Sequence, residues 1–403
     1  DPTHVSERFF GEIIDRMSMH TGKASVEPSP TTHSSRPAEL AALRGPKKGS
    51  VRVLTVGSIP PEWGGSVAGG VATVHRSLVE AFLKSNAVDL VGVIPTRRVD
   101  ESLIPGVVPL VQDSTEEGFK ELASSVDVIL MNHITHRWAD YQARTRETPC
   151  IGFVHSWSKY LRSSDPDAVR RHLKQNMIGM TCLVFPSRFC ADEGESLGFE
   201  YPVGVRVIRN SVPQLYESEP PIRDRRGVVF IGALNDWKRP DLVIEACAQL
   251  QVPLSIVGDG PNRARLEYLA GDGDVQFKGE LPPSEVRELL LASEALCVPS
   301  RSESFGLVYL EAAASGTPSV GHGPSISELF ETVGVPCGVG VPPDATVEQV
   351  VTALREVLDH QWDHRMMHQG AIRALGPDRF AAQFVDLVTE VASSEESDGT
   401  GCR

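Results

Sequence analysis

The sequence lacks several features that would assign it to a common class of protein. It has no run of about 18 apolar residues, so we expect no transmembrane helix. Acidic residues outnumber basic ones by 53 to 39, and the net charge of −14 argues against chain-wide attraction to nucleic acid or anionic membranes. Neither GxSxG, HExxH nor a Walker lysine loop is present, so the sequence gives little support for hydrolase or ATPase activity.

Cysteine is also used sparingly. The seven cysteines are odd in number, no CxxC occurs, and most of them lie within apolar runs typical of buried strands and helices. A disulfide scaffold or a zinc ribbon is therefore not expected, and a reduced, cytoplasmic compartment fits better.

What the sequence does contain is enough apolar residues for two domains, because 41% of its 403 residues are hydrophobic. Short β-branched apolar runs alternate with helical patterns, which predicts doubly wound α/β domains with parallel sheets. A Pro-rich, charged stretch over 212–227 reads as a linker. The predicted parts are a mostly disordered N-terminal arm (1–50), a first domain (51–214), a second domain (222–375) and a flexible tail (393–403).

Two such domains form a cleft at the carboxyl ends of their strands, where ligands bind near helix N-termini. The segment PSRSESFGLVYLEAAASGTP follows an apolar strand and opens a helix. Gly306 lets a ligand approach the backbone, and the carboxylates of Glu303 and Glu311 suit a hydroxyl-rich ligand. On spacing alone, both glutamates could equally be surface charges of a solvated helix.

The pattern E-S-F-G-x-x-x-x-E, followed by A-x-x-x-G-T-P, resembles the signature of the retaining glycosyltransferases of family 4. The resemblance extends over about residues 51–390 and implies the GT-B fold, with two Rossmann-like domains facing across a cleft. It implies that the first domain (51–214) lies on the acceptor side and that the second (222–375) binds the nucleotide-sugar donor. It implies that Glu303 contacts the donor sugar and that Glu311 holds the ribose. The amides of Phe305, Gly306 and Leu307 would serve the sugar and phosphate.

The segment VVFIGALNDWKRP resembles the G-R-L-x-x-x-K-G segment of the same family. Lys238 then matches the lysine that neutralises the donor diphosphate, where charge helps most as the leaving group departs. Ala233 replaces the family's arginine and Arg239 its glycine. The loss of a guanidinium removes bidentate phosphate contacts. Arg239, the neighbour of Lys238 in the sequence, is the candidate to compensate for this loss.

Two residues of the first domain complete the implied site. Gly70 belongs to a glycine-rich loop that resembles the family's loop near the donor phosphate. His155 ends an apolar strand where a family histidine contacts the donor sugar, although a lone histidine there is more often structural. His133, His136 and Trp138 follow another strand and are expected on the acceptor side.

Other segments carry weaker expectations. Asp165-Pro-Asp167 and Asp272-Gly-Asp274 have metal-binding DxD spacing, but they lie in turn-like sequence where Asp and Gly are expected anyway. The resemblance implies that no metal is bound. Glu328 only loosely matches a family glutamate. The resemblance further implies that a last helix, 378–392, packs back onto the first domain.

The resemblance therefore implies a retaining, metal-independent glycosyltransferase that acts through a front-face mechanism and requires no cofactor. The nucleotide-sugar donor, with a UDP-sugar favoured, is a substrate, and the acceptor is a small molecule, lipid or glycan. We assign His155, Glu303 and Lys238 to catalysis, and a set of six residues to donor binding: Gly70, Lys238, Phe305, Gly306, Leu307 and Glu311. A catalytically degenerate binding protein and a sugar-nucleotide epimerase remain alternatives.

Overall fold

The apolar runs of the first half form a sheet of six parallel strands in the order β2-β1-β3-β4-β5-β6. Most of these strands are buried on both faces, as their continuous apolar sequences require. The chain places β2 on one side of β1 and β3 on the other, so the topological switch point lies between β1 and β3. The strands are β1 (Val51–Gly57), β2 (Val88–Pro95), β3 (Val128–Met131), β4 (Cys150–Phe153), β5 (Cys182–Phe185) and β6 (Gly204–Val207).

The second half forms another sheet of six parallel strands, in the order β12-β11-β10-β7-β8-β9. Here the switch point lies between β7 and β10, so the loops that follow these two strands meet at one edge of the sheet. The strands are β7 (Val228–Ile231), β8 (Leu254–Val257), β9 (Val275–Gly279), β10 (Ala295–Val298), β11 (Ser319–His322) and β12 (Gly338–Val341).

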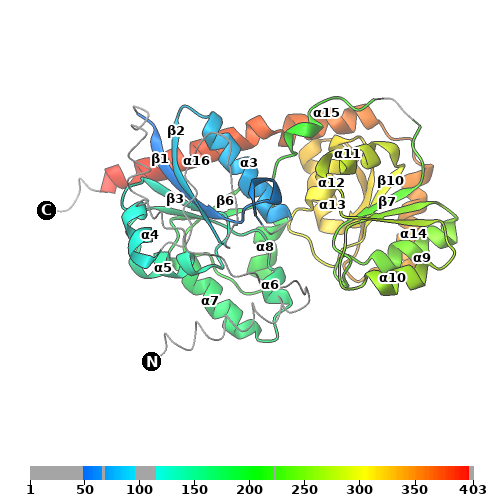
Figure 1. The fold of residues 1–403 in the computed structure, drawn as a ribbon, viewed down its shortest axis with the longest axis horizontal. Coiled ribbons are helices and arrows are strands. Elements are labelled where there is room, and N and C mark those ends of the chain that lie inside the picture. The colour runs from blue at the N-terminus through cyan, green and yellow to red at the C-terminus, as the bar shows by residue number, and fades with distance from the viewer. Residues whose placement is uncertain (1–48, 66–68, 97–114, 222–223, 399–403) are drawn as a thin grey trace, which may run out of the picture. The chain divides into compact units, whose positions relative to one another are not determined.

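The computed structural model describes residues 49–65, 69–96, 115–221 and 224–398. The predicted arm 1–50 therefore lies outside the described residues apart from its last two, and so do residues 399–403 of the predicted tail. Figure 1 shows the two sheets with helices on both faces of each. This arrangement confirms the predicted pair of Rossmann-like domains.

Helices connect the strands, and some of them begin at a residue whose side chain caps the helix. Thr346 and Gln349 form the predicted capping box of α14, and Asp165 of the DxD-like segment caps α7 by accepting from the backbone N–H of Ala168 at 2.9 Å. The helices of the first half are α3 (Gly70–Lys84), α4 (Glu116–Ala123), α5 (Arg137–Thr145), α6 (Ser158–Leu161), α7 (Pro166–Ile178) and α8 (Arg188–Ser196). Those of the second half are α9 (Pro240–Leu250), α10 (Arg263–Ala270), α11 (Pro283–Ala292), α12 (Leu307–Ala314), α13 (Gly323–Val333), α14 (Val347–Asp359), α15 (His364–Leu375) and α16 (Pro377–Asp398), with short 3₁₀ turns at Pro61–Trp63 and Gln214–Tyr216.

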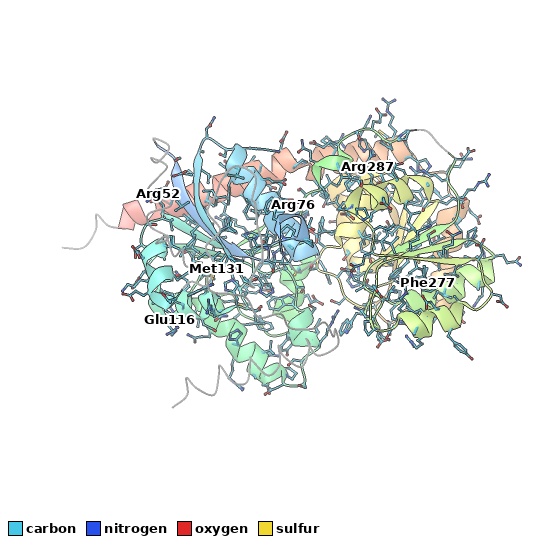
Figure 2. All side chains as sticks on the ribbon, in the orientation of Figure 1. Arg52, Arg76, Glu116, Met131, Phe277 and Arg287 are labelled. Carbon is cyan, nitrogen blue, oxygen red and sulfur yellow. The ribbon has the colours of Figure 1, made fainter. Side chains whose placement is uncertain are left out.

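The first sheet has a separate hydrophobic core on each face. Successive strand residues point to opposite sides, so Val53 joins one core and Leu54 the other. Met131, labelled in Figure 2, is fully buried in the core that lies under α4, α5, α7 and α8. The opposite core is covered by α3 and α16.

Helix α16 belongs to the first domain although it comes last in the chain. Its apolar residues, among them Phe380 and Phe384, pack in the same core as Val53 of β1. The helix continues to Asp398, past residue 392 where the predicted helix ends and the predicted tail begins. The sequence from Ser393 to Asp398 contains neither glycine nor proline, so nothing there stops the helix before Gly399.

The chain passes between the two domains twice, and the two crossings lie side by side. The backbone N–H of Val212 on the outward crossing donates to the carbonyl of Leu375 on the return, at 3.0 Å. The second domain is thus a continuous segment held between two parts of the first.

Candidate functional site

The loop after β7 presents Lys238 at the switch point of the second sheet. The side-chain oxygen of Asn235 accepts from the backbone N–H groups of Trp237 (3.0 Å) and Lys238 (3.1 Å), which fixes the turn. Arg239 follows in the left-handed conformation, with φ of 55°, and Pro240 then starts α9. The local sequence therefore holds Lys238 at the end of a rigid turn.

The loop after β10 brings Glu303 to the same place. One carboxylate oxygen of Glu303, Oε1, accepts from Lys238 Nζ and from Ser300 Oγ, the latter at 2.8 Å. The backbone N–H of Arg301 also donates to the Trp237 carbonyl at 2.8 Å, which joins the two loops directly. Two predicted catalytic residues thus form an ion pair at the carboxyl ends of β7 and β10.

The N-terminus of α12 follows Glu303 by four residues in the sequence and carries backbone N–H donors. Gly306 precedes the helix with φ of 79°, and an added Cβ there would approach the Tyr309 ring to 2.3 Å. Only glycine fits both restrictions. The first N–H groups of a helix have no intrahelical acceptors, so this end favours an anionic ligand. Phe305 is buried in the core of the second domain and thereby anchors the loop that leads into α12.

Glu311 lies further along α12 and is half-buried. Burial raises the pKa of its carboxyl to about 7, and the positive charge of Arg76 in α3 partly opposes this shift. The negative charge of Glu311 in turn adds to the effect of burial that raises the pKa of Tyr216. Arg76, labelled in Figure 2, therefore brings charge from the first domain close to the predicted ribose site.

His155 follows β4 and is held in place from two sides. Its ring stacks on Phe153 with 4.0 Å between centroids, and its Nε2 lies 3.1 Å from Oδ1 of Asn132. The amide nitrogen of Asn132 donates to the Val71 carbonyl, so its oxygen faces the imidazole and His155 carries its proton on Nε2. Burial, reinforced by His133 and His75, lowers the pKa of His155 to about 3, so the ring is neutral.

Asn132 is a site residue that the sequence analysis missed. It comes directly after β3, one of the two strands that flank the switch point of the first sheet, and it is fully buried. The sequence feature that could have identified Asn132 is a polar residue immediately after an apolar strand. Its contact with His155 depends on the pairing of β3 with β4, which the sequence alone does not give.

The structure places the predicted acceptor-side residues His136 and Trp138 in different surroundings. Burial lowers the pKa of His136 to about 3, and neither ring nitrogen has a hydrogen-bond partner among the described residues. Trp138 does not line a site, contrary to the prediction. It is 3% exposed and stacks on Phe119 with centroids 4.5 Å apart, because it lies on the apolar face of α5 that covers the sheet.

Gly70 is the first residue of α3 and lies close to the second domain. An added Cβ at Gly70 would come within 3.0 Å of the Leu307 side chain at the start of α12. Two predicted donor-binding residues from different domains are thus neighbours. Residues 66–68 of the same loop lie outside the described residues.

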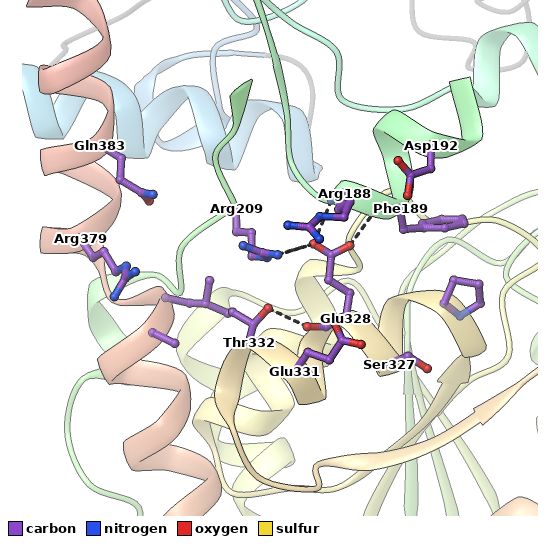
Figure 3. Close-up of a pocket in the computed structure, with 13 residues that line it drawn as sticks. Arg188, Phe189, Asp192, Arg209, Ser327, Glu328, Glu331, Thr332, Arg379 and Gln383 are labelled. Atoms are coloured by element: carbon purple, nitrogen blue, oxygen red, sulfur yellow. Dashed lines mark hydrogen bonds and ion pairs between the residues drawn. The ribbon is translucent and has the colours of Figure 1, made fainter. Parts of the chain in front are cut away.

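A cavity of about 510 Å³ lies elsewhere between the domains, and none of the predicted donor-site residues lines it. Figure 3 shows Glu328 of α13 at its wall. The Glu328 carboxylate accepts from the backbone N–H groups of Arg188 and Phe189, both at 2.9 Å, and from the Arg209 guanidinium at 2.9 Å. Glu328 therefore caps α8 of the first domain from the second domain.

Two features are absent from the part of the chain that the structure describes. No helix there is both long and apolar enough to cross a membrane. No three His, Cys, Asp or Glu side chains there are arranged to hold a metal ion.

Comparison with known sequences finds one family in the second half of the chain. Residues 215–373 match the model described as glycosyl transferases group 1. Over 109 residues the chain is 39% identical to D-inositol 3-phosphate glycosyltransferase of Mycobacterium tuberculosis, a stretch that is 24% of this chain and 22% of that protein. The chain thus matches about a fifth of the length of its curated relatives.

Comparison with solved structures covers both domains. Sucrose-phosphate synthase from Thermosynechococcus elongatus superposes with a TM-score of 0.67 at 18% identity, over 85% of this chain and 100% of the other. HepE of Anabaena, solved in complex with UDP and glucose, superposes with a TM-score of 0.65 at 15% identity, over 84% and 99%. These likenesses confirm the predicted GT-B fold, whose second domain here matches the group 1 glycosyl transferases.

Proposed function

We propose that this protein is a retaining glycosyltransferase that takes a sugar from a nucleoside diphosphate sugar, with a UDP-sugar favoured. The observation that carries the proposal is the Lys238–Glu303 ion pair beside the N-terminus of α12. A cation, a carboxylate and free backbone donors at one switch point suit a ligand that joins a diphosphate to a sugar. The match to the group 1 glycosyl transferases and the likeness to a protein solved with UDP and glucose support the same choice.

In the proposed reaction, the bond between the anomeric carbon and the leaving phosphate oxygen breaks first. The acceptor hydroxyl attacks from the same face, and the departing phosphate takes its proton, so the configuration is retained. Lys238 and the α12 amides stabilise the charge that develops on the leaving diphosphate, and the mechanism requires no metal. The acceptor is a hydroxyl-bearing small molecule, lipid or glycan.

His155 and Glu303 act on the sugar side in this proposal. Because His155 is neutral and donates to Asn132, it offers the sugar a dipole without adding positive charge beside the oxocarbenium-like ion. Glu303 orients the sugar hydroxyls, and Glu311 accepts from the ribose. Closure of the two domains then excludes water from the reacting centre.

Nucleotide binding tests the donor half of this proposal. We expect UDP to raise the unfolding temperature by several degrees, because a ligand at about 100 times its Kd adds about 2.7 kcal/mol of stability. GDP, ADP and TDP should give smaller shifts, and Glu311→Ala should abolish the UDP shift. Glu356→Ala, which changes an exposed glutamate on α14, is the matched control and should keep it.

An activity assay then separates the proposal from its two alternatives. Release of UDP from a UDP-sugar only when an acceptor is added supports transfer and excludes an epimerase. A degenerate binding protein is favoured by Ala233, which adds no charge to the loop after β7. Nucleotide binding without turnover across an acceptor screen would support that alternative, and no shift with any nucleotide at millimolar concentration would refute the donor site.

A further inference from the structure

The loop after β7 offers little positive charge for a diphosphate. The diphosphate of a nucleotide sugar carries two negative charges, whereas Lys238 is already paired with Glu303, so this pair has no net charge. The Arg239 guanidinium lies 3.4 Å from the Asp241 carboxylate and is thereby held at the first turn of α9. Ala233 contributes only a methyl group. A second cation at this site must come from another part of the chain.

Arg162 of the first domain lies against this same loop. Its guanidinium carbon is 4.5 Å from the centroid of the Trp237 ring, a cation–π distance, and Trp237 directly precedes Lys238. Burial lowers the pKa of Arg162 and the Glu303 carboxylate opposes that shift, so the two side chains lie within electrostatic reach. Among the described residues, no carboxylate forms an ion pair with Arg162.

The backbone around Arg162 is anchored while its side chain remains exposed. Arg162 ends α6, and its N–H donates to the Ser158 carbonyl at 3.0 Å. Trp157, at the start of α6, is buried and donates from its indole nitrogen to the Cys190 carbonyl at 2.7 Å. A long cationic side chain is thus presented from a fixed point, with its guanidinium free to form new hydrogen bonds.

We propose that Arg162 binds the diphosphate of the nucleotide-sugar donor, as a guanidinium supplied by the first domain to a site otherwise built by the second. The planar fork of arginine matches phosphate oxygens bidentately, and the Trp237 ring holds the fork beside Lys238. This inference rests on the proposed function. It makes donor binding depend on both domains at once.

The test compares UDP with uridine, which lacks both phosphates. We expect Arg162→Ala to weaken UDP binding about 10- to 100-fold, because one charge-assisted contact contributes about 1.5–3 kcal/mol. Uridine binding should change less than about twofold. Arg162→Lys, which keeps the charge but loses the fork, should lie between wild type and alanine. Arg171→Ala, at an exposed arginine on α7, is the matched control and should bind UDP like wild type.

Calorimetry of the full chain with both ligands gives the two affinities, and thermal unfolding without ligand shows whether each variant is folded. If wild type binds UDP but Arg162→Ala binds it equally well, the role of Arg162 is refuted while the proposed function stands. An equal loss for UDP and uridine would also refute it, because the effect would not involve phosphate. If wild type binds neither UDP nor GDP, ADP or TDP, the proposed function itself fails.

Discussion

At the scale of single residues, the half-buried Glu311 makes stability depend on pH. Its carboxyl has a pKa of about 7 in the folded protein and about 4.5 when unfolded, so the native state holds the proton more tightly. As the pH rises from 4.5 to 7, the wild type should therefore lose stability relative to Glu311→Gln, by about 1–3 kcal/mol. Urea unfolding of both proteins at several pH values measures this difference.

The control for this prediction is Glu356→Gln on the exposed face of α14. Its stability should follow that of the wild type at every pH. A difference between wild type and Glu311→Gln that stays constant from pH 4.5 to 8 would contradict the raised pKa. Arg76 and Tyr216 are the groups that share this environment, so both must be intact in the proteins compared.

Among the candidate site residues, those within short motifs were predictable and those that meet them through tertiary contacts were not. Lys238, Glu303 and Gly306 stand in recognisable segments that follow apolar strands. Arg162 and Asn132 carry no motif, because their surroundings are created by the packing of distant segments. The direction of Arg239 was equally unreadable, since it depends on the turn that places the side chain next to Asp241.

At the scale of elements, α8 depends on a cap from the other domain. The Glu328 carboxylate is 7% exposed and accepts from two N–H groups of the first turn of α8 and from Arg209. Glu328→Ala should lower stability by about 1–2 kcal/mol, because it leaves these part-buried donors without their acceptor. Urea unfolding followed by circular dichroism measures the loss.

Two substitutions sharpen this test. Glu328→Gln should lie between wild type and alanine, because its amide oxygen can still accept from one N–H group while its –NH₂ faces the other donor. Glu331→Ala, on the exposed side of the same helix, should change stability by no more than about 0.5 kcal/mol. Equal effects of Glu328→Ala and Glu331→Ala would show that the carboxylate has no capping role.

Most elements could be predicted because their signals are local. Apolar β-branched runs gave the strands, and the Thr346–Gln349 pair gave the start of α14. The cap of α8 could not be predicted, because Glu328 follows Arg188 by 140 residues. The end of α16 was placed too early because Ser, Glu and Asp favour disorder by composition but do not forbid a helix.

At the scale of the whole molecule, α16 links the end of the chain to the site. Phe384 is fully buried and its ring lies 5.9 Å from that of Phe153, which in turn stacks on His155. Phe384→Ala should destabilise the protein by about 3–5 kcal/mol through loss of contacts and cavity formation. Thermal and urea unfolding measure this change, and exposed Asp386→Ala should be nearly neutral.

A small effect of Phe384→Ala, comparable to that of Asp386→Ala, would show that α16 does not support the core of the first domain.

The general architecture was predictable from the alternation of strands and helices. The order of strands within each sheet was not, because it depends on which loops cross to which side of β1 and β7.

The hydrogen bond between Val212 and Leu375 has a consequence for how such proteins diversify. Residues between these points form an internal cassette, and the two ends of the cassette are neighbours in space. A recombination event that replaces this segment with a homologous one creates two junctions in the gene. In the folded protein, both junctions lie at the same place on the host domain. The host keeps its own sheet and its returning helix α16, so the segment and the host can change sequence separately within one polypeptide, provided that the contacts between them are kept.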